Sequence, residues 1–155
     1  FLYLQNFYLH KITLQKMSFK HKIIELNEMF TLFDNPMDKY SQLIELGKNN
    51  KGIPAKSKND FNRIYGCASL AWIETYKKNE LYFVLTDSDT FIVKGLLNIL
   101  KIIIDGENKE EIYKLNIENI LNNIGLENSI TSQRTNGFLS ALDKIKNQIE
   151  KLNGK

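Results

Sequence analysis

The chain has 155 residues and a mass of 18.1 kDa, and 43% of its residues are hydrophobic, which suits one well-buried core rather than two. Its net charge of +3 comes from lysines interleaved with acidic residues, and no basic stretch alternates with aromatic residues as in a nucleic-acid-binding groove. The single cysteine excludes an internal disulfide and a cysteine-rich metal site, and it argues for a reducing compartment rather than secretion.

The chain divides into an N-terminal extension of unknown role, residues 1–17, and one domain, residues 18–155. The extension is rich in aromatic and aliphatic residues. It lacks the basic start, continuous apolar centre and small-residue cleavage site of a signal peptide. Because the sequence begins with Phe1 rather than Met, we expect the chain to be a fragment or a processed product.

Two amphipathic helices are predicted at the start of the domain. Apolar residues recur at alternating spacings of four and three from Phe19 to Phe33, which is typical of one helical face. Pro36 opens the second helix, and Gly47 ends it. Residues 48–60 have no apolar period and are expected to form an exposed loop.

The apolar period then changes to that of short strands. Alternation and turn residues predict three strands and one hairpin turn between the last two: residues 61–64, 70–76 and 81–86, with the turn at Lys78-Asn79. The bend between the first two strands contains Cys67. Gly66 precedes the cysteine and allows the tight backbone conformation that such a bend needs.

A long apolar helix follows, from about Phe91 to Ile104. Lysines interrupt it, so it falls short of the roughly 18 apolar residues of a membrane span and is predicted to be a buried central helix. Its N-cap is expected at one of three residues: Asp87, Ser88 or Asp89. Shorter helices are predicted from Asn108 and over residues 116–125, and a last one over residues 135–152. The predicted fold class is α+β, with a small three-stranded antiparallel sheet packed against several helices.

Cys67 is the first candidate for function. A lone cysteine often only fills space in a core, so a structural role is the alternative. A cysteine hydrolase needs a histidine base, but His10 lies in the extension and His21 on the polar side of the first helix. The sequence shows no metal-ligand set and no phosphate-binding glycine pattern. The remaining reaction class is exchange at sulfur, in which a thiolate attacks a disulfide or persulfide without an acid–base partner.

The chain uses lysine as its usual cation and has only two arginines, Arg63 and Arg134. A guanidinium presents a planar fork of donors to a carboxylate or carbonyl, so a retained arginine can mark a recognition site. Chance placement is the alternative for both.

Residues 64–72 read Ile-Tyr-Gly-Cys-Ala-Ser-Leu-Ala-Trp. This segment resembles the Gly-Cys-x-Ser-x-x-Trp active-site segment of the SufE family, the sulfur-acceptor proteins of iron–sulfur cluster assembly. Three more segments resemble family segments in the same order: the second helix at 40–47, the strand-to-helix junction at 87–96 and the start of the last helix at 134–138. The resemblance spans about residues 18–152. It departs from the family where Ser132-Gln133 replace the usual Pro-Ser.

The resemblance implies a fold shared with IscU-type scaffold proteins and a sulfur carrier rather than a stand-alone enzyme. By that resemblance, Cys67 accepts the sulfane sulfur of a persulfide on a SufS-like cysteine desulfurase, stimulates that enzyme, and passes the sulfur to a SufB-containing scaffold. The PLP belongs to the desulfurase, so no cofactor and no metal is expected on this chain. Membership also implies a monomer or weak dimer in a bacterial cytoplasm or a plastid-type organelle such as an apicoplast.

The resemblance further implies that the cysteine loop rests with its sulfur in an apolar pocket and swings outward on docking. Gly66 and Ser69 fall in this loop, and Asp89 and Arg134 match positions tied to loop placement and desulfurase contact. Two of these residues also have a local explanation: Asp89 as a helix-terminus carboxylate, and Ser69 as a hydrogen-bonding partner of the loop backbone. A different class of function stays open, a regulatory module that docks on a desulfurase or another partner without carrying sulfur.

Overall fold

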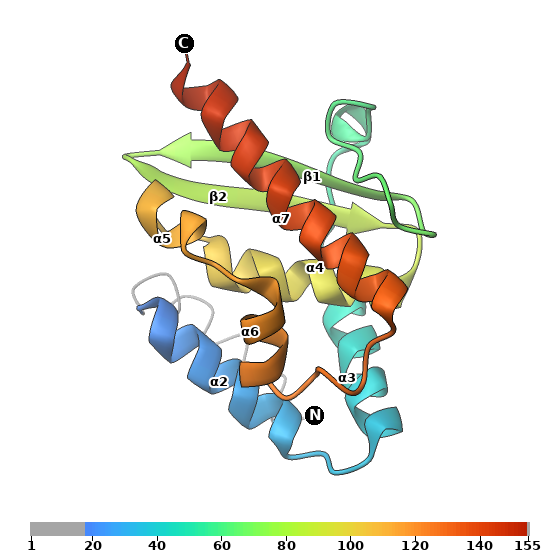
Figure 1. The fold of residues 1–155 in the computed structure, drawn as a ribbon. Coiled ribbons are helices and arrows are strands. Elements are labelled where there is room, and N and C mark those ends of the chain that lie inside the picture. The colour runs from blue at the N-terminus through green and yellow to red at the C-terminus, as the bar shows by residue number, and fades with distance from the viewer. Residues whose placement is uncertain (1–17, 155) are drawn as a thin grey trace.

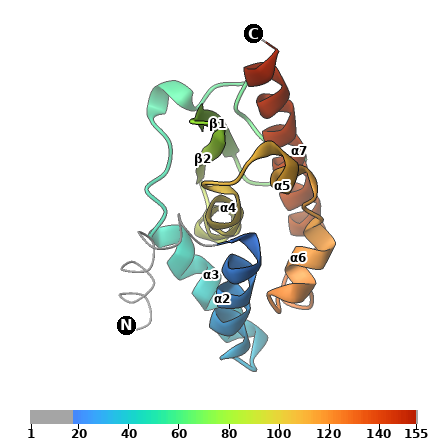
Figure 2. The same ribbon diagram turned by 90° about the vertical axis from the view of Figure 1, so that its left-hand side faces the viewer.

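The computed structural model describes residues 18–154, so the predicted N-terminal extension lies outside the described residues. The elements in chain order are α2 (Phe19–Thr31), α3 (Pro36–Lys48), a 3-10 turn η1 (Ala55–Ser57), β1 (Ala71–Lys78), β2 (Leu81–Ser88), α4 (Phe91–Ile104), α5 (Lys109–Tyr113), α6 (Ile117–Asn123) and α7 (Ser132–Asn153). Helix α4 lies between the β-hairpin and the pair α2 and α3, while α7 runs across the hairpin (Figures 1 and 2). The α+β class is confirmed.

The hairpin of β1 and β2 pairs in one continuous antiparallel register from Ala71↔Ser88 to Lys78↔Leu81. Its two loop residues are Asn79 and Glu80, with φ angles of 51° and 65°. Positive φ at both positions is the requirement of the two-residue turn that matches strand twist. The turn expected at Lys78-Asn79 is therefore wrong by one residue.

The third strand expected over residues 61–64 is not present. The described residues form a two-stranded sheet, and Arg63 makes only an isolated bridge with Trp72. A side chain takes the next positions along the edge of β1: Gln148 accepts from the Thr75 N–H at 2.9 Å and donates to the Ile73 carbonyl at 2.8 Å. Because this amide from α7 already satisfies the strand edge, the pairing ends after one bridge.

Helix α4 is the centre of the fold, as expected from its apolar sequence, and most of its side chains are buried. It lies very close to α3, since a Cβ added to Gly95 would be 1.9 Å from the Leu43 carbonyl oxygen. The N-cap expected at Asp87, Ser88 or Asp89 is wrong. Strand β2 continues to Ser88, and Thr90 is the N-cap, although its side chain makes no capping hydrogen bond.

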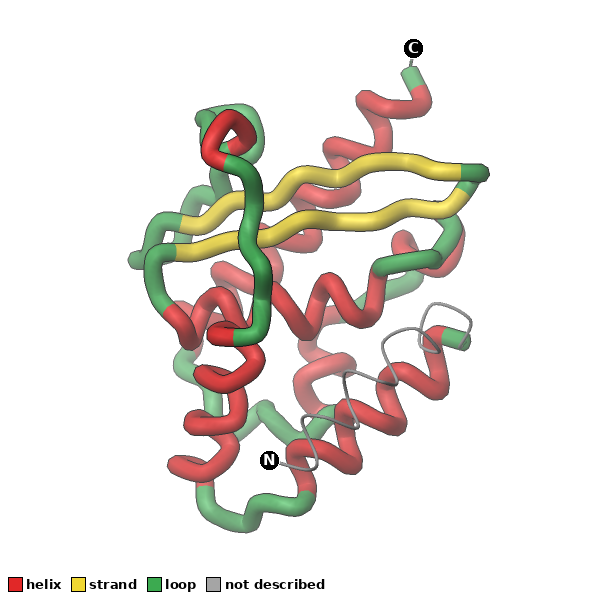
Figure 3. Tube along the Cα trace, turned by 180° about the vertical axis from the view of Figure 1, so that it is seen from behind, coloured by secondary structure: helices red, strands yellow, loops and turns green. Residues whose placement is uncertain are grey.

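Residues 48–60 differ from the expected exposed loop because three of their side chains are buried: Asn50, Ile53 and Ser57. Figure 3 shows this segment crossing the outer side of the hairpin, opposite α7. The Ile53 N–H donates to the Asp87 carboxylate at 3.2 Å, and this bond ties the crossing segment to the end of β2. The segment thus covers the cysteine-loop end of the sheet.

A buried lysine joins α2 to the end of α4. Lys22 is 1% exposed, and its ammonium donates to the carbonyls of Ile103 and Asp105 and pairs with Glu107 at 2.9 Å. The last carbonyls of a helix lack partners within the helix, so this ammonium satisfies them from outside. The predicted apolar face of α2 gave no indication of this contact.

Candidate functional site

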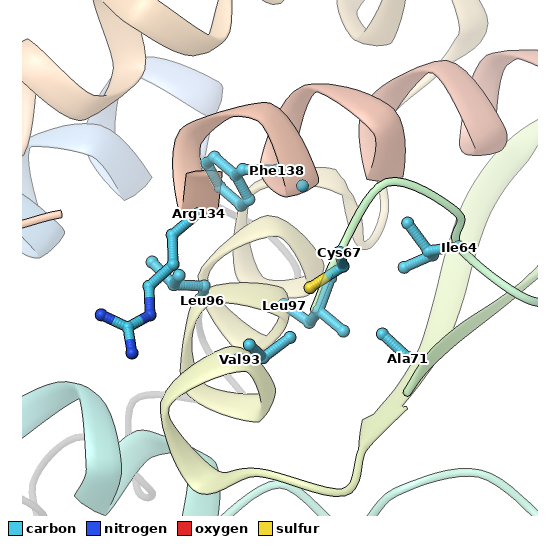
Figure 4. A pocket seen from close by; sticks show the side chains of 9 residues that line it. Ile64, Cys67, Ala71, Val93, Leu96, Leu97, Arg134 and Phe138 are labelled. Atoms are coloured by element: carbon cyan, nitrogen blue, oxygen red, sulfur yellow. The ribbon is translucent and has the colours of Figure 1, made fainter. Parts of the chain in front are cut away.

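Cys67 lies in the loop between Ile64 and β1, where its side chain is half-buried. The sulfur points into a pocket formed by the loop, α4 and the first turns of α7 (Figure 4). The other lining residues are almost all apolar: Ile64, Ala71, Val93, Leu96, Leu97, Gly137 and Phe138, with Arg134 at the rim. The free volume of the pocket is about 10 Å³. That is close to the smallest space that holds one water molecule.

Two glycines allow this close approach of the loop to α7. A Cβ added to Gly137 would be 3.4 Å from the Cys67 sulfur and 3.5 Å from its Cβ. Gly66 has a φ of 86°, a conformation that costs other residues energy. A glycine inside a helix costs about 1 kcal/mol relative to alanine, so its presence at position 137 indicates a packing requirement. Gly137 is not among the site residues predicted from the sequence.

The ionisable groups that line the pocket are Cys67 and Arg134. The Arg134 guanidinium points away from the sulfur (Figure 4) and lies over the Tyr40 ring, 5.4 Å from its centroid. Its Nη2 donates to the Tyr40 hydroxyl at 3.3 Å. Within residues 18–154, His21 is the only histidine, and it pairs with Ser18 at the start of α2 rather than with the cysteine. The pocket therefore offers the thiol no general base.

The loop ends in a stem that is attached to the junction between β2 and α4. The Leu70 carbonyl accepts from the Ser88 hydroxyl at 2.8 Å and from the Asp89 N–H at 3.1 Å. The hydroxyls of Ser69 and Thr90 are 3.0 Å apart and form a hydrogen bond. Of the two predicted residues here, Ser69 thus contacts the junction through its side chain and Asp89 through its backbone, while the Asp89 side chain is exposed.

Asp87 forms a cluster of ion pairs and hydrogen bonds beside the loop. Its prediction as a helix cap did not include this role. Its carboxylate accepts from the N–H groups of Ile53 and Ser88 and pairs with Lys58 and Lys94 at 3.2 and 3.5 Å. Burial alone would raise the pKa of Asp87, but these partners together lower it below the ordinary aspartate value. The carboxylate therefore stays ionised and links the crossing segment to the strand end.

Three large apolar side chains are exposed on the segments that carry or adjoin the loop. Tyr65 is 58% exposed, Leu70 40% and Phe91 52%. Exposed apolar residues gathered around a reactive group are typical of protein docking sites. None of the three is among the site residues predicted from the sequence.

Across residues 18–154 no group of acidic, cysteine and histidine side chains has the arrangement of a metal site. None of the helices in that range is both long and apolar enough to cross a bilayer.

Comparison with known proteins places this arrangement in a family. Residues 24–149 match the family model SufE, described as the Fe-S metabolism associated domain. An uncharacterized SufE-like protein of Rhizobium meliloti is 35% identical over 78% of this chain and 89% of its own length. The sulfur acceptor protein CsdE of Escherichia coli is 32% identical over 69% of this chain and 73% of its own.

A cysteine desulfuration protein SufE of Plasmodium falciparum is 32% identical over 81% of this chain, which spans 52% of that longer protein. Among solved structures, that of a hypothetical protein from Thermus thermophilus superposes with a TM-score of 0.70, covering 86% of this chain and 97% of that one. Its 18% sequence identity supports the fold alone. The extent of the family match, together with relatives above 30% identity, shows that this chain belongs to the SufE family.

Proposed function

We propose that Cys67 accepts sulfur from the persulfide of a SufS-like cysteine desulfurase. The Cys67 thiol loses its proton to solvent, and the thiolate attacks the outer sulfur of the partner's persulfide. The S–S bond of that persulfide breaks, and the desulfurase cysteine leaves as a thiolate and takes up a proton. The products are a Cys67 persulfide and a free desulfurase cysteine, so the sulfur is transferred without any net oxidation or reduction.

The observation that carries this proposal is the apolar pocket around a single thiol. Hydrolysis by a cysteine needs a base, and the pocket residues provide none. Exchange at sulfur needs only a thiolate and an electrophilic sulfur, which a docked partner supplies. The free volume of about 10 Å³ beside the thiol is also too small for a substrate molecule, since such pockets usually exceed about 300 Å³.

The rest of the proposal concerns partners. The SufE-family relatives named as a sulfur acceptor and as a cysteine desulfuration protein support transfer from a desulfurase. We propose that the chain, as a monomer or weak dimer, stimulates this desulfurase, that PLP resides on the desulfurase, and that the sulfur passes to a SufB-containing scaffold. Relatives from bacteria, from Plasmodium falciparum and from the chloroplast or mitochondria of Arabidopsis thaliana fit a bacterial cytoplasm or a plastid-type organelle.

The test uses the intact protein, a SufS-like desulfurase and cysteine. Mass spectrometry should show an added mass of one sulfur atom on the wild type, and Cys67→Ser should show none because serine is a far poorer nucleophile at sulfur. Cys67→Ser should also lose stimulation of the desulfurase while still binding it. Stimulation of the desulfurase by Cys67→Ser at the wild-type level would instead identify the chain as a regulatory module that carries no sulfur.

A further inference from the structure

The backbone of residues 65–68 makes no hydrogen bond to any part of the described chain. Both ends of this stretch are held. On one side the Ile64 N–H donates to the Ala71 carbonyl at 2.8 Å. On the other side the Ser69 hydroxyl forms a 3.0 Å hydrogen bond with the Thr90 hydroxyl. Movement of residues 65–68 therefore breaks no backbone hydrogen bond, whereas movement of the stem does.

Thr90 is an unusual N-cap. Threonine is favoured at this position because its hydroxyl accepts from the first N–H groups of the helix. Here it makes no such bond, although the backbone is extended and α4 begins normally with the Lys94 N–H donating to the Thr90 carbonyl. The hydroxyl is directed at Ser69 instead. A residue suited to stabilise its own helix thus holds the cysteine loop.

We propose that Ser69 and Thr90 form a positioning pair that ends the movable part of the loop at Ala68 and keeps the Cys67 sulfur in its pocket. The Ser88 bond to the Leu70 carbonyl holds the next residue, so the pair is the last restraint before the unbonded stretch. Without it, Ser69 joins the movable part and the sulfur leaves the pocket more often. The exposed Asp89 side chain is not needed for this restraint, since only its backbone contacts Leu70.

The inference depends on the proposed function for its biological meaning, but it is tested on the isolated protein by the alkylation rate of Cys67 with iodoacetamide. Thr90→Val and Ser69→Ala should each raise the rate on the order of fivefold, the effect of losing one ordinary hydrogen bond. The serine variant Thr90→Ser restores a hydroxyl and should alkylate nearly as slowly as the wild type. Thr31→Val is the matched control because it removes the 2.7 Å bond of Thr31 to Asn27 at the far end of α2.

A double-mutant cycle separates positioning from general destabilisation. If the hydroxyls act on each other, the double variant should alkylate no faster than either single variant. Rates that multiply in the double variant, or single-variant rates equal to that of Thr31→Val, would overturn the inference. The thermal unfolding midpoint of each variant shows whether that variant is folded. If the variants alkylate at the expected rates but Cys67 gains no persulfide in the presence of desulfurase, the proposed function is contradicted and the positioning pair is not.

Discussion

Gly137 is the residue whose replacement tests most directly how the thiol is sheltered. Leucine at this position places its side-chain carbons where the Cys67 side chain lies, because a Cβ there would already be 3.4 Å from the sulfur. Alanine adds only that Cβ, at ordinary contact distance. Gly137→Ala therefore tests contact with the sulfur, whereas Gly137→Leu tests its displacement from the pocket. Alanine and leucine both have a higher helix propensity than glycine.

The expected magnitude follows from the contacts that hold the loop closed. Within residues 18–154 the backbone of residues 65–68 makes no hydrogen bond, so burial of the Cys67 side chain is the main restraint on this stretch. Burying its two heavy atoms is worth about 1.5 kcal/mol, at about 0.8 kcal/mol for each methylene-sized group. Loss of that stabilisation should raise the open population about tenfold. Leucine also has a higher helix propensity than glycine, by about 0.8 kcal/mol, and this gain offsets part of any packing strain in α7.

Iodoacetamide labelling of Cys67, followed by mass spectrometry, measures the open population in each variant. We expect Gly137→Ala to stay within about twofold of the wild type and to keep or raise the thermal midpoint. Gly137→Leu should label about tenfold faster at a midpoint close to that of the wild type. If Gly137→Leu is folded and its Cys67 is labelled at the wild-type rate, the contact between Cys67 and Gly137 of α7 does not shelter the thiol.

Two further predictions concern Arg134 and Asp87. Arg134→Ala should weaken binding to a SufS-like desulfurase roughly thirtyfold, the effect of losing about 2 kcal/mol of charge-assisted contact; in calorimetric titrations Arg134→Lys should be intermediate, and unchanged affinity of the alanine variant would reduce Arg134 to a surface charge. The lowered pKa of Asp87 means that its ionised form stabilises the fold above the ordinary value of 3.8 and that this contribution is lost as the pH falls through the lower folded-state pKa. Asp87→Asn should therefore have a lower free energy of unfolding in urea than the wild type at neutral pH, and this difference should narrow as the pH is lowered. A difference that does not change with pH would contradict the stabilising role of the ionised Asp87 carboxylate.

Local sequence patterns determined most of the helices and the chemistry open to the thiol. The apolar spacing of Phe19 to Phe33, the proline at position 36 and the continuous apolar run of α4 each act within a few residues, so they can be interpreted without a fold. The capping of α5 by Asn108 is confirmed on the same basis, since its side chain accepts from the Glu111 N–H at 2.9 Å. The absence of further cysteines likewise excludes an internal disulfide and a cysteine-rich metal site whatever the fold.

The tertiary structure decided which partners complete the sheet and the site. Gln148 replaces the expected third strand at the edge of β1, Lys22 satisfies the end of α4, and Gly137 meets Cys67 although 70 positions separate them in the chain. Asp89 could be identified from the sequence because it lies in a recognisable segment, but it contacts the loop stem only through its backbone N–H. The side-chain contacts to the stem come from its neighbours Ser88 and Thr90. Such contacts depend on how buried surfaces pack and on which polar groups are left unsatisfied there, and both are properties of the folded chain rather than of any local segment.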